Sequence, residues 1–191
     1  GGLFLAHSDD NGLGLPPKLA PIHVAIVPIW NSDAEKASVL EASDRLAREL
    51  RDDGLTVKLD DRDDKRPGEK YYEWERKGVP LRLEVGPRDV ASGSAMAKSR
   101  IGDPKAKEKL PFDGIGGSVA KMLDQMQSEL FRRALAFREA HTVTRATWCD
   151  FEAVFAELGV YDEFAPSLEP GEPRDIITLG YRRPEWDKYK T

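Results

Sequence analysis

The densest group of side chains able to do chemistry lies in one charged stretch before the middle of the chain. It combines hydrogen-bond donors, acceptors and flat stacking surfaces on Lys70, Glu73, Trp74, Glu75, Arg76 and Lys77. Proteins recognise unstacked RNA bases with this mixture, because a base is a flat ring whose edge carries both donors and acceptors. The residues alone still favour a simpler interpretation, in which an amphipathic helix keeps its aromatic rings in the core and its charges in water.

Other kinds of site find less support in the residues. The aspartates of 60–64 could bind a divalent cation, but Arg62 lies among them and Lys65 follows. Such a loop of mixed sign is more typical of a solvated surface. None of the three histidines has a Cys or His partner at ligand spacing, and the single cysteine, Cys149, excludes an internal disulfide and a cysteine-rich zinc site. We therefore expect no metal site and no zinc. Gly12 and Gly14 lack the third glycine and the helix of a dinucleotide fingerprint.

Length and charge narrow the class of protein. The 191 residues are enough for one well-cored domain and a smaller appendage. No apolar run approaches the roughly 20 residues of a membrane span, and the start shows no signal-peptide pattern, so we expect a cytoplasmic protein with no membrane partner. The net charge of −5 argues against a nucleic-acid binder, although residues 98–109 carry five basic and two acidic side chains.

The elements that would position the charged stretch follow from periodicity. The apolar run 23–30 predicts a strand buried on both faces, and 55–59 predicts a second strand. Between them, Ser32 and Glu35 have the spacing of a capping box and open a helix that Gly54 ends. Strand, helix and strand predict a βαβ unit. The acidic loop after it then lies at the carboxyl end of a strand, where open α/β sheets bind ligands.

The remaining elements are expected from shorter patterns. We expect a strand over 1–7, a helix over 67–77, strands over 81–85 and 91–100, a loop over 102–111, a long helix from 114, a helix over 148–158 and a strand over 176–181. In the strand over 91–100 we expect Ala95 and Ala97 to point inward and Lys98 outward.

The charged stretch and its surroundings resemble the anticodon-binding domain of prolyl-tRNA synthetases of the archaeal/eukaryotic-like type. The matching residues are Asp60-Asp61-Arg62-Asp63, Pro67-Gly68, Lys70, Glu73-Trp74-Glu75, Lys77-Gly78-Val79-Pro80, Arg82, Glu84 and Gly86-Pro87-Arg88-Asp89-Val90. The end of that family's class II catalytic domain, with its third class motif, is similar to His7-Ser8-Asp9-Asp10, Gly12-Leu13, Leu15-Pro16-Pro17, Leu19-Ala20-Pro21 and Val27-Pro28-Ile29. Residues 130–142 resemble the helix that leaves the domain.

The resemblance covers residues 1–142 and implies an α/β fold, a mixed five-stranded sheet flanked by helices, with a small C-terminal α+β appendage. In this organisation residues 1–20 are the end of the class II catalytic domain, 21–142 the anticodon-binding domain and 143–191 a C-terminal extension. Class motifs one and two are absent. We therefore expect a piece of a longer protein or a free-standing relative, inactive alone and without catalytic residues.

The function implied by the resemblance is that of a homodimeric cytoplasmic ligase, which attaches proline to its tRNA with ATP and Mg²⁺. None of these cofactors is expected on this chain alone. The anticodon-binding residues would be Arg62, Lys70, Glu73 and Lys77, the contacts to the tRNA backbone Lys98, Arg100 and Arg132, and the remnant of the ATP and prolyl-adenylate site His7, Ser8 and Lys18. Lys18 stands where the third motif usually has an arginine, and a lysine cannot stack on adenine as a guanidinium does.

Two alternatives stay open from the sequence. A protein-interaction or regulatory module could keep this fold without binding RNA, as the net charge suggests. The chain could also be the related domain of a synthetase for glycine, threonine or histidine, although the residues from Pro67 to Asp89 favour proline.

Overall fold

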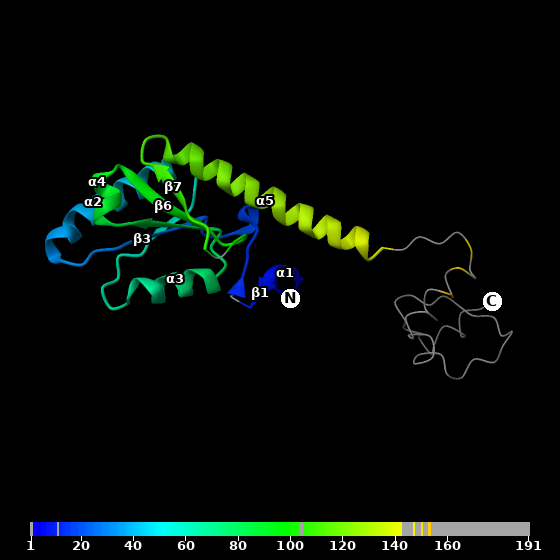
Figure 1. Ribbon diagram of the computed structural model, residues 1–191. Helices are drawn as coiled ribbons and strands as arrows, with labels where there is room; N and C mark the ends of the chain where they lie inside the picture. Colours follow the sequence, from blue (N-terminus) through cyan, green and yellow to red (C-terminus); the bar gives the residue numbers. More distant parts are fainter. Residues whose placement is uncertain are drawn as a thin grey trace. The chain divides into compact units, whose positions relative to one another are not determined.

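The computed structural model describes residues 2–10, 12–103 and 105–142, together with Thr147, Asp150 and Ala153. The chain divides into two units, Gly1–Ala140 and His141–Thr191. All labelled helices and strands in Figure 1 belong to the first unit. The expected C-terminal appendage and the strand over 176–181 lie outside the described residues. So does the helix over 148–158, apart from two of its positions.

A mixed five-stranded sheet forms the centre of the first unit (Figure 1), with the order β4-β3-β5-β6-β7. The strands are β3 (Val24–Pro28), β4 (Val57–Leu59), β5 (Leu81–Val85), β6 (Ser94–Ser99) and β7 (Glu108–Pro111). β3 pairs in parallel with β4 and β5, whereas β6 is antiparallel to both β5 and β7. The predicted mixed five-stranded sheet and its parallel βαβ unit are therefore confirmed.

Helices cover both faces of this sheet and make three layers. On one face α2 (Asp33–Asp52), α4 (Pro87–Ala91) and α5 (Ile115–Ala140) enclose the larger core. On the other face α3 (Pro67–Arg76) packs through Trp74 on Ala25 and Val27. All five residues of β3 are buried, as its apolar run predicts. The larger core contains Val24, Ile26, Val39, Leu46, Leu50, Leu81, Leu83, Val85, Val119 and Leu123.

The N-terminal segment differs from the prediction. Residues Gly2–His7 form a short helix, α1, and not a strand. A short apolar run has no periodicity that separates helix from strand, and Leu5 is 91% exposed, so this run does not enter a sheet. After it, β1 (Ser8–Asp9) and β2 (Gly12–Leu13) form an antiparallel hairpin. A 3-10 turn, η1 (Pro17–Leu19), follows.

Three further expectations are corrected. The expected loop over 102–111 contains β7, whose Leu110 is buried and whose Pro111 sits at the sheet edge, where a missing N–H is tolerated. Lys98, expected to point outward, is only 8% exposed because other residues cover that face of β6. The capping box at α2 does not form: the Ser32 side chain makes no capping bond, and Glu35 instead accepts from the backbone N–H of Asn31 at 3.0 Å.

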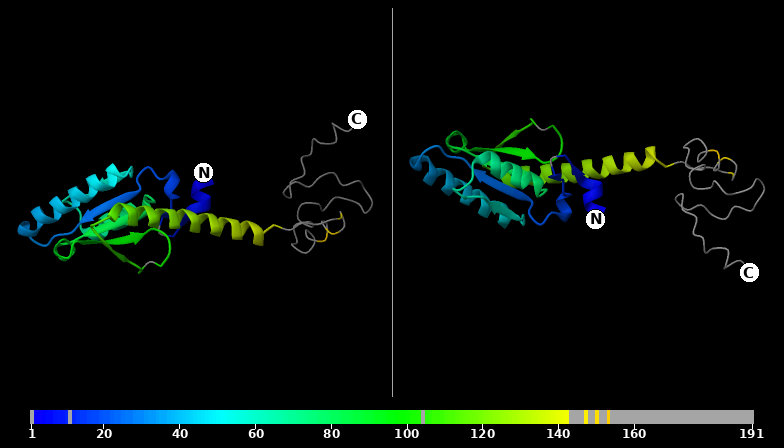
Figure 2. Two further views of the ribbon diagram at one scale, coloured as in Figure 1. Left: turned by 90° about the horizontal axis from the view of Figure 1, so that it is seen from above. Right: turned by 90° about the horizontal axis from the view of Figure 1, so that it is seen from below.

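The long helix α5 confirms the prediction of a helix from residue 114. Its first half buries Val119, Leu123 and Met126 in the domain. Its second half continues past the sheet (Figure 2), and Phe131 is 66% exposed there. Over the residues that the structure describes, no helix has the length and apolar character needed to cross a membrane.

Candidate nucleic-acid interface

Helix α3 carries most of the predicted site residues, and local contacts determine where it begins and ends. The Glu69 carboxylate accepts a hydrogen bond from the backbone N–H of Arg66 at 2.9 Å, which satisfies a free donor at the start of the helix. Gly78 ends it with a φ of +76°, a conformation that costs glycine nothing. Trp74 is 5% exposed and fixes the helix on the sheet. The charged residues around Trp74 form two networks.

The first network is centred on the carboxylate of Asp60, which is 2% exposed. Arg62 binds it with two nitrogens, at 2.7 Å from Oδ1 and 2.6 Å from Oδ2. The indole Nε1 of Trp74 donates to Oδ2 at 2.8 Å, and the Lys70 ammonium donates to the Asp60 carbonyl at 3.1 Å. Lys70 is itself 2% exposed. It therefore holds the end of β4 and α3 together and has no free surface for a base.

Glu73 extends this network toward the solvent. Arg62, Lys65 and Lys77 all contact its carboxylate, at 3.0, 2.7 and 2.7 Å. The three cations occupy both oxygens of Glu73, whereas the cations themselves remain between one third and one half exposed. Of the four predicted base-binding residues, Arg62 and Lys77 thus reach the surface, while Lys70 and Glu73 are used inside the protein.

The second network is centred on Arg82 of β5, a residue that the sequence analysis did not assign to the site. Its Nη1 lies 2.6 Å from Glu75 Oε1, and its Nε and Nη2 lie 3.2 and 3.0 Å from Glu84 Oε1. Lys107, in the β6–β7 connection, donates to Glu84 Oε2 at 2.6 Å. The guanidinium carbon of Arg82 is 3.9 Å from the centre of the Tyr71 ring. Tyr71 and Glu75 come from α3, so three elements meet here.

The second network offers the chemistry that a base requires. The Tyr71 ring is only partly buried and supplies a flat surface for stacking, while Arg82, with a side chain 8% exposed, supports the ring from inside the protein. The side chains of Glu75 and Lys107 are 35% and 39% exposed, which leaves an acceptor and a donor at the surface beside the ring. The sequence does hold a signal for part of this network: apolar and charged residues alternate along β5, which puts Arg82 and Glu84 on the same side of the strand. That alternation could not show that α3 and residue 107 would lie against the same side.

Electrostatics keep the groups of both networks in defined protonation states. Burial alone would raise the pKa of Asp60, but hydrogen bonds from Arg62 and Trp74 hold it below its ordinary value. Hydrogen bonds from Lys65, Lys77 and Arg62 lower the pKa of Glu73 well below the usual range. Burial, with the nearby Glu84 charge, raises the pKa of Tyr71 well above that of a free phenol. At neutral pH the carboxylates of Asp60 and Glu73 are therefore ionised and Tyr71 remains a neutral hydrogen-bond donor.

Two of the predicted backbone-binding residues are not at the surface. The Lys98 ammonium donates to the Asp103 carbonyl at 2.6 Å, and burial lowers its pKa. The Arg100 side chain is 5% exposed and is fully engaged with acceptors inside the protein. A contact to the tRNA backbone requires an exposed cation, whereas the side chains of Lys98 and Arg100 are both buried. We therefore do not retain Lys98 or Arg100 as contacts to RNA phosphates.

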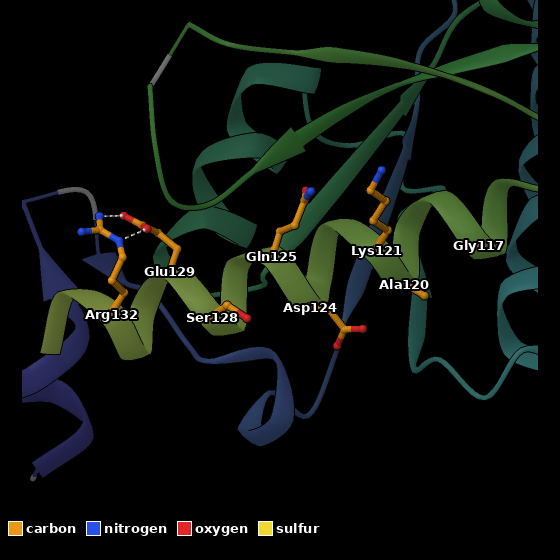
Figure 3. Close-up of a pocket in the computed structure, with 8 residues that line it drawn as sticks. All are labelled: Gly117, Ala120, Lys121, Asp124, Gln125, Ser128, Glu129 and Arg132. Carbon is orange, nitrogen blue, oxygen red and sulfur yellow. Dashed lines mark hydrogen bonds and ion pairs between the residues drawn. The ribbon is translucent and has the colours of Figure 1, made fainter. Parts of the chain in front are cut away.

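Arg132, the third predicted backbone contact, is exposed on α5. Its side chain is 68% exposed and pairs with Glu129 through two bonds of 2.8 Å (Figure 3). Arg132 and Arg133 together lower the pKa of Glu129 to about 2. A hollow of about 690 Å³ runs along this part of the helix and is lined by Gly117, Ala120, Lys121, Asp124, Gln125, Ser128, Glu129 and Arg132. Its charges are of both signs, so it is not a strongly basic surface.

The residues that resemble a nucleotide site lie near the start of the chain. His7 is half-buried in the last turn of α1, and its carbonyl accepts from the Gly14 N–H at 2.8 Å. Ser8 and Lys18 are exposed. The backbone N–H of Lys18 donates to the Gln127 side chain at 3.1 Å, which joins η1 to α5. Among the residues that the structure describes, no three His, Cys, Asp or Glu side chains lie close enough together to hold a metal ion.

Two comparisons with known proteins agree with the observed fold. A family model described as "Anticodon binding domain" matches residues 23–122, which include β3, both charge networks and the first turns of α5. A solved structure, that of prolyl-tRNA synthetase from Cryptosporidium parvum complexed with L-proline and AMP, superposes with a TM-score of 0.68 at 33% identity. The match covers 76% of this chain and 31% of that one.

Curated relatives with similar sequences are proline–tRNA ligases. The enzyme of Roseiflexus sp. (strain RS-1) is 42% identical over 175 residues, which cover 91% of this chain and 34% of the relative. The chloroplastic/mitochondrial enzyme of Arabidopsis thaliana is 44% identical over 147 residues, covering 75% and 27%. The chain thus spans about a third of the length of the relatives it matches. A match over 91% of the chain must extend past residue 142, so the similarity reaches beyond the residues 1–142 that the resemblance covered.

Because the family model covers more than half of the chain, the chain belongs to the anticodon-binding domain family.

Proposed function

We propose that this chain binds the anticodon of a proline tRNA and does so as part of a proline–tRNA ligase. The names of its relatives support the choice of enzyme. The observation that carries the proposal is the second network, in which the Tyr71–Arg82 pair lies between the partly exposed side chains of Glu75 and Lys107.

In this proposal an unstacked base lies against the Tyr71 ring, which Arg82 holds in place from behind, and presents its edge to the charged side chains. Glu75 accepts from an amino or ring N–H, and Lys107 donates to a carbonyl oxygen or ring nitrogen. Guanine has both kinds of group on its edges. Tyr71 and Arg82 already lie together in the free protein, so little ordering is required on binding.

The roles of the first network then divide by exposure. Arg62 and Lys77 can contact neighbouring nucleotides because their side chains are 35% and 51% exposed. Lys70 and Glu73 act indirectly, since they fix the loop after β4 against α3. Arg132 remains a candidate for a phosphate contact, which it could make by exchanging Glu129 for the phosphate.

The parent enzyme would be a cytoplasmic homodimer that joins proline to tRNA with ATP and Mg²⁺. Residues 1–20 would belong to its catalytic domain, 21–142 to its anticodon-binding domain and 143–191 to an extension. Ser8 and Lys18 are exposed and can donate hydrogen bonds to a phosphate, so they fit one end of a nucleotide site. The described residues include no cluster of His, Cys, Asp or Glu that could hold the metal ion. We therefore derive no step of the ligation itself.

Fluorescence anisotropy with a labelled stem–loop RNA tests the proposal directly. The chain should bind a stem–loop with a proline anticodon more tightly than the same stem with a lysine anticodon. Affinity should fall with rising salt, because phosphate contacts release counterions. Equal affinity for the two RNAs would contradict anticodon recognition.

The net charge of −5 keeps one alternative in view, a protein-interaction module with the same fold. It predicts no RNA binding at all. A gel shift with total tRNA at low salt separates the two, since the absence of a shift at micromolar protein favours the alternative.

A further inference from the structure

Arg100, at the end of β6, joins segments that lie far apart in the sequence. Its Nη1 and Nη2 bind the Asp9 carboxylate at 3.0 and 2.6 Å, and Nη2 also donates to the Gly12 carbonyl at 3.0 Å. Its Nε is shared between the carbonyls of Leu13 and Glu75, both at 3.2 Å. One buried guanidinium therefore holds the β1–β2 hairpin and the last turn of α3 together.

Close backbone contacts hold the hairpin at the same place. Gly12 has a φ of +124°, and a Cβ built on it would lie 2.7 Å from the Arg76 Cα. A Cβ on Gly78 would lie 2.7 Å from the Leu13 carbonyl oxygen. The Leu15 N–H donates to the Gly78 carbonyl at 3.3 Å. The hairpin thus packs directly on the backbone at the end of α3.

Glu75 belongs to both the base-binding network and this junction. Its carboxylate pairs with Arg82 at 2.6 Å, and its carbonyl accepts from Arg100. A base that binds Glu75 and Tyr71 immobilises the last turn of α3 and, through Arg100, the hairpin. We infer that Arg100 is a positioning residue that links the base-binding surface of α3 to the β1–β2 hairpin, so that RNA binding stabilises the docked position of the hairpin. This inference rests on the proposed function.

Linkage makes the effect reciprocal. If bound RNA stabilises the docked hairpin, the docked hairpin strengthens RNA binding by the same factor. Such a coupling factor between two sites is typically about 5-fold to 150-fold. Loosening the hairpin by mutation should therefore weaken RNA binding, although neither Asp9 nor Arg100 touches the RNA.

Amide hydrogen exchange of the full 191-residue chain, with and without the proline-anticodon stem–loop, tests the inference. In the wild type we expect RNA to slow exchange at Gly14 and Leu15 about fivefold or more. Asp9→Asn keeps the size of the side chain and the carbonyl contacts of Arg100 but removes the carboxylate. In this variant the slowing should be largely lost and RNA affinity should fall by a similar factor. Arg100→Lys keeps the charge but cannot make the same fork of bonds, and it should behave like Asp9→Asn.

The control is Arg48→Gln, on the opposite face of the sheet with a 71% exposed side chain, which should behave as the wild type. RNA that binds and slows exchange in α3 but leaves Gly14 and Leu15 unchanged would overturn the inference and leave the proposed function intact. If no RNA binds, the proposed function fails, and the inference that RNA stabilises the docked hairpin fails with it. The junction itself is then judged without RNA: faster exchange at Lys77 and Gly78 in Asp9→Asn would support the link, and unchanged exchange would refute it.

Discussion

The guanidinium of Arg82 lies 3.9 Å from the centre of the Tyr71 ring, while the same guanidinium pairs with Glu75 and Glu84. An arginine held from both edges keeps its flat face in one orientation, and here that face supports the Tyr71 ring. The ring is therefore held ready for stacking, and each of its supports can be tested by itself.

Replacing Arg82 by lysine should weaken binding of the proline stem–loop by about 1–3 kcal/mol, the range for one lost base contact, because Tyr71 and Glu75 lose the guanidinium that holds them. Lysine keeps the charge but loses the planar fork and the stack on Tyr71. Anisotropy titrations measure the affinity, and thermal unfolding shows whether the fold is retained. Arg48→Lys is the matched control. An unchanged affinity in a folded Arg82→Lys protein would remove this pair from the interface.

Lys70 and Lys77 should separate structural from binding roles. Lys70→Met removes a 2% exposed ammonium, so RNA affinity should stay within about twofold once the protein is folded, because no base contact is lost. Lys77 is 51% exposed on its side chain, so Lys77→Met should change stability by less than about 0.5 kcal/mol while it lowers RNA affinity. Both variants are compared by urea unfolding and anisotropy. The opposite pattern would mean that Lys70 leaves its buried position to meet RNA.

Asp60→Ala should destabilise the protein by about 3–5 kcal/mol, because it leaves Arg62 and the Trp74 indole without their buried partner. Asp61→Ala, next to it and exposed, is the control and should stay within about 0.5 kcal/mol of the wild type. Urea unfolding at pH 7 measures both. A small effect at Asp60 would show that the first network contributes little to the fold.

Stability should fall at acid pH in a way that depends on Asp60 and Glu73. Both have a folded-state pKa below the unfolded value, so their stabilising effect is complete above about pH 4, the ordinary range of carboxyl groups. It is lost as the pH falls through the folded-state pKa of each group. Urea unfolding between pH 7 and pH 2 should show a steep loss in the wild type. The Asp60→Asn, Glu73→Gln double variant should show a flatter curve, and an equally steep one would contradict this assignment.

Gly78→Ala should destabilise the protein more than Gly54→Ala. Both glycines have positive φ, of +76° and +83°, which costs an alanine about 1–2 kcal/mol. Only at Gly78 would the new Cβ also meet the Leu13 carbonyl, at 2.7 Å, whereas nothing lies within 4 Å at Gly54. Unfolding free energies of the two variants give the comparison directly. Equal losses would mean that the hairpin moves away without cost.

Much of the fold followed from local patterns. The apolar run of β3, the stripe of α2, the charged helix α3 and the long helix α5 each have a periodicity that fits one element, and Gly54 and Gly78 end their helices as expected. β7 was missed because Lys109 and Pro111 mark a loop locally, and only pairing with β6 makes the segment a strand. α1 was missed because its apolar run has no period.

The site could be predicted only in part, for a related reason. Arg62, Lys70, Glu73 and Lys77 do gather around α3, but exposure decides their roles, and exposure depends on contacts such as Lys70 with the Asp60 carbonyl. Lys107 meets Glu84 across 23 residues of sequence, and Arg100 meets Asp9 across 91. No pattern of types and spacings shows such distant pairs before the sheet has formed.

The bare-backbone contact between Gly12 and Arg76 has a consequence for protein engineering. A chimera that takes its first 20 residues from one relative and the remainder from another would place a foreign hairpin against the end of α3. The backbones lie so close there that any larger residue at the contact would clash. The hairpin, the last turn of α3 and Arg100 should therefore be exchanged as a unit, even though they come from three separate parts of the chain.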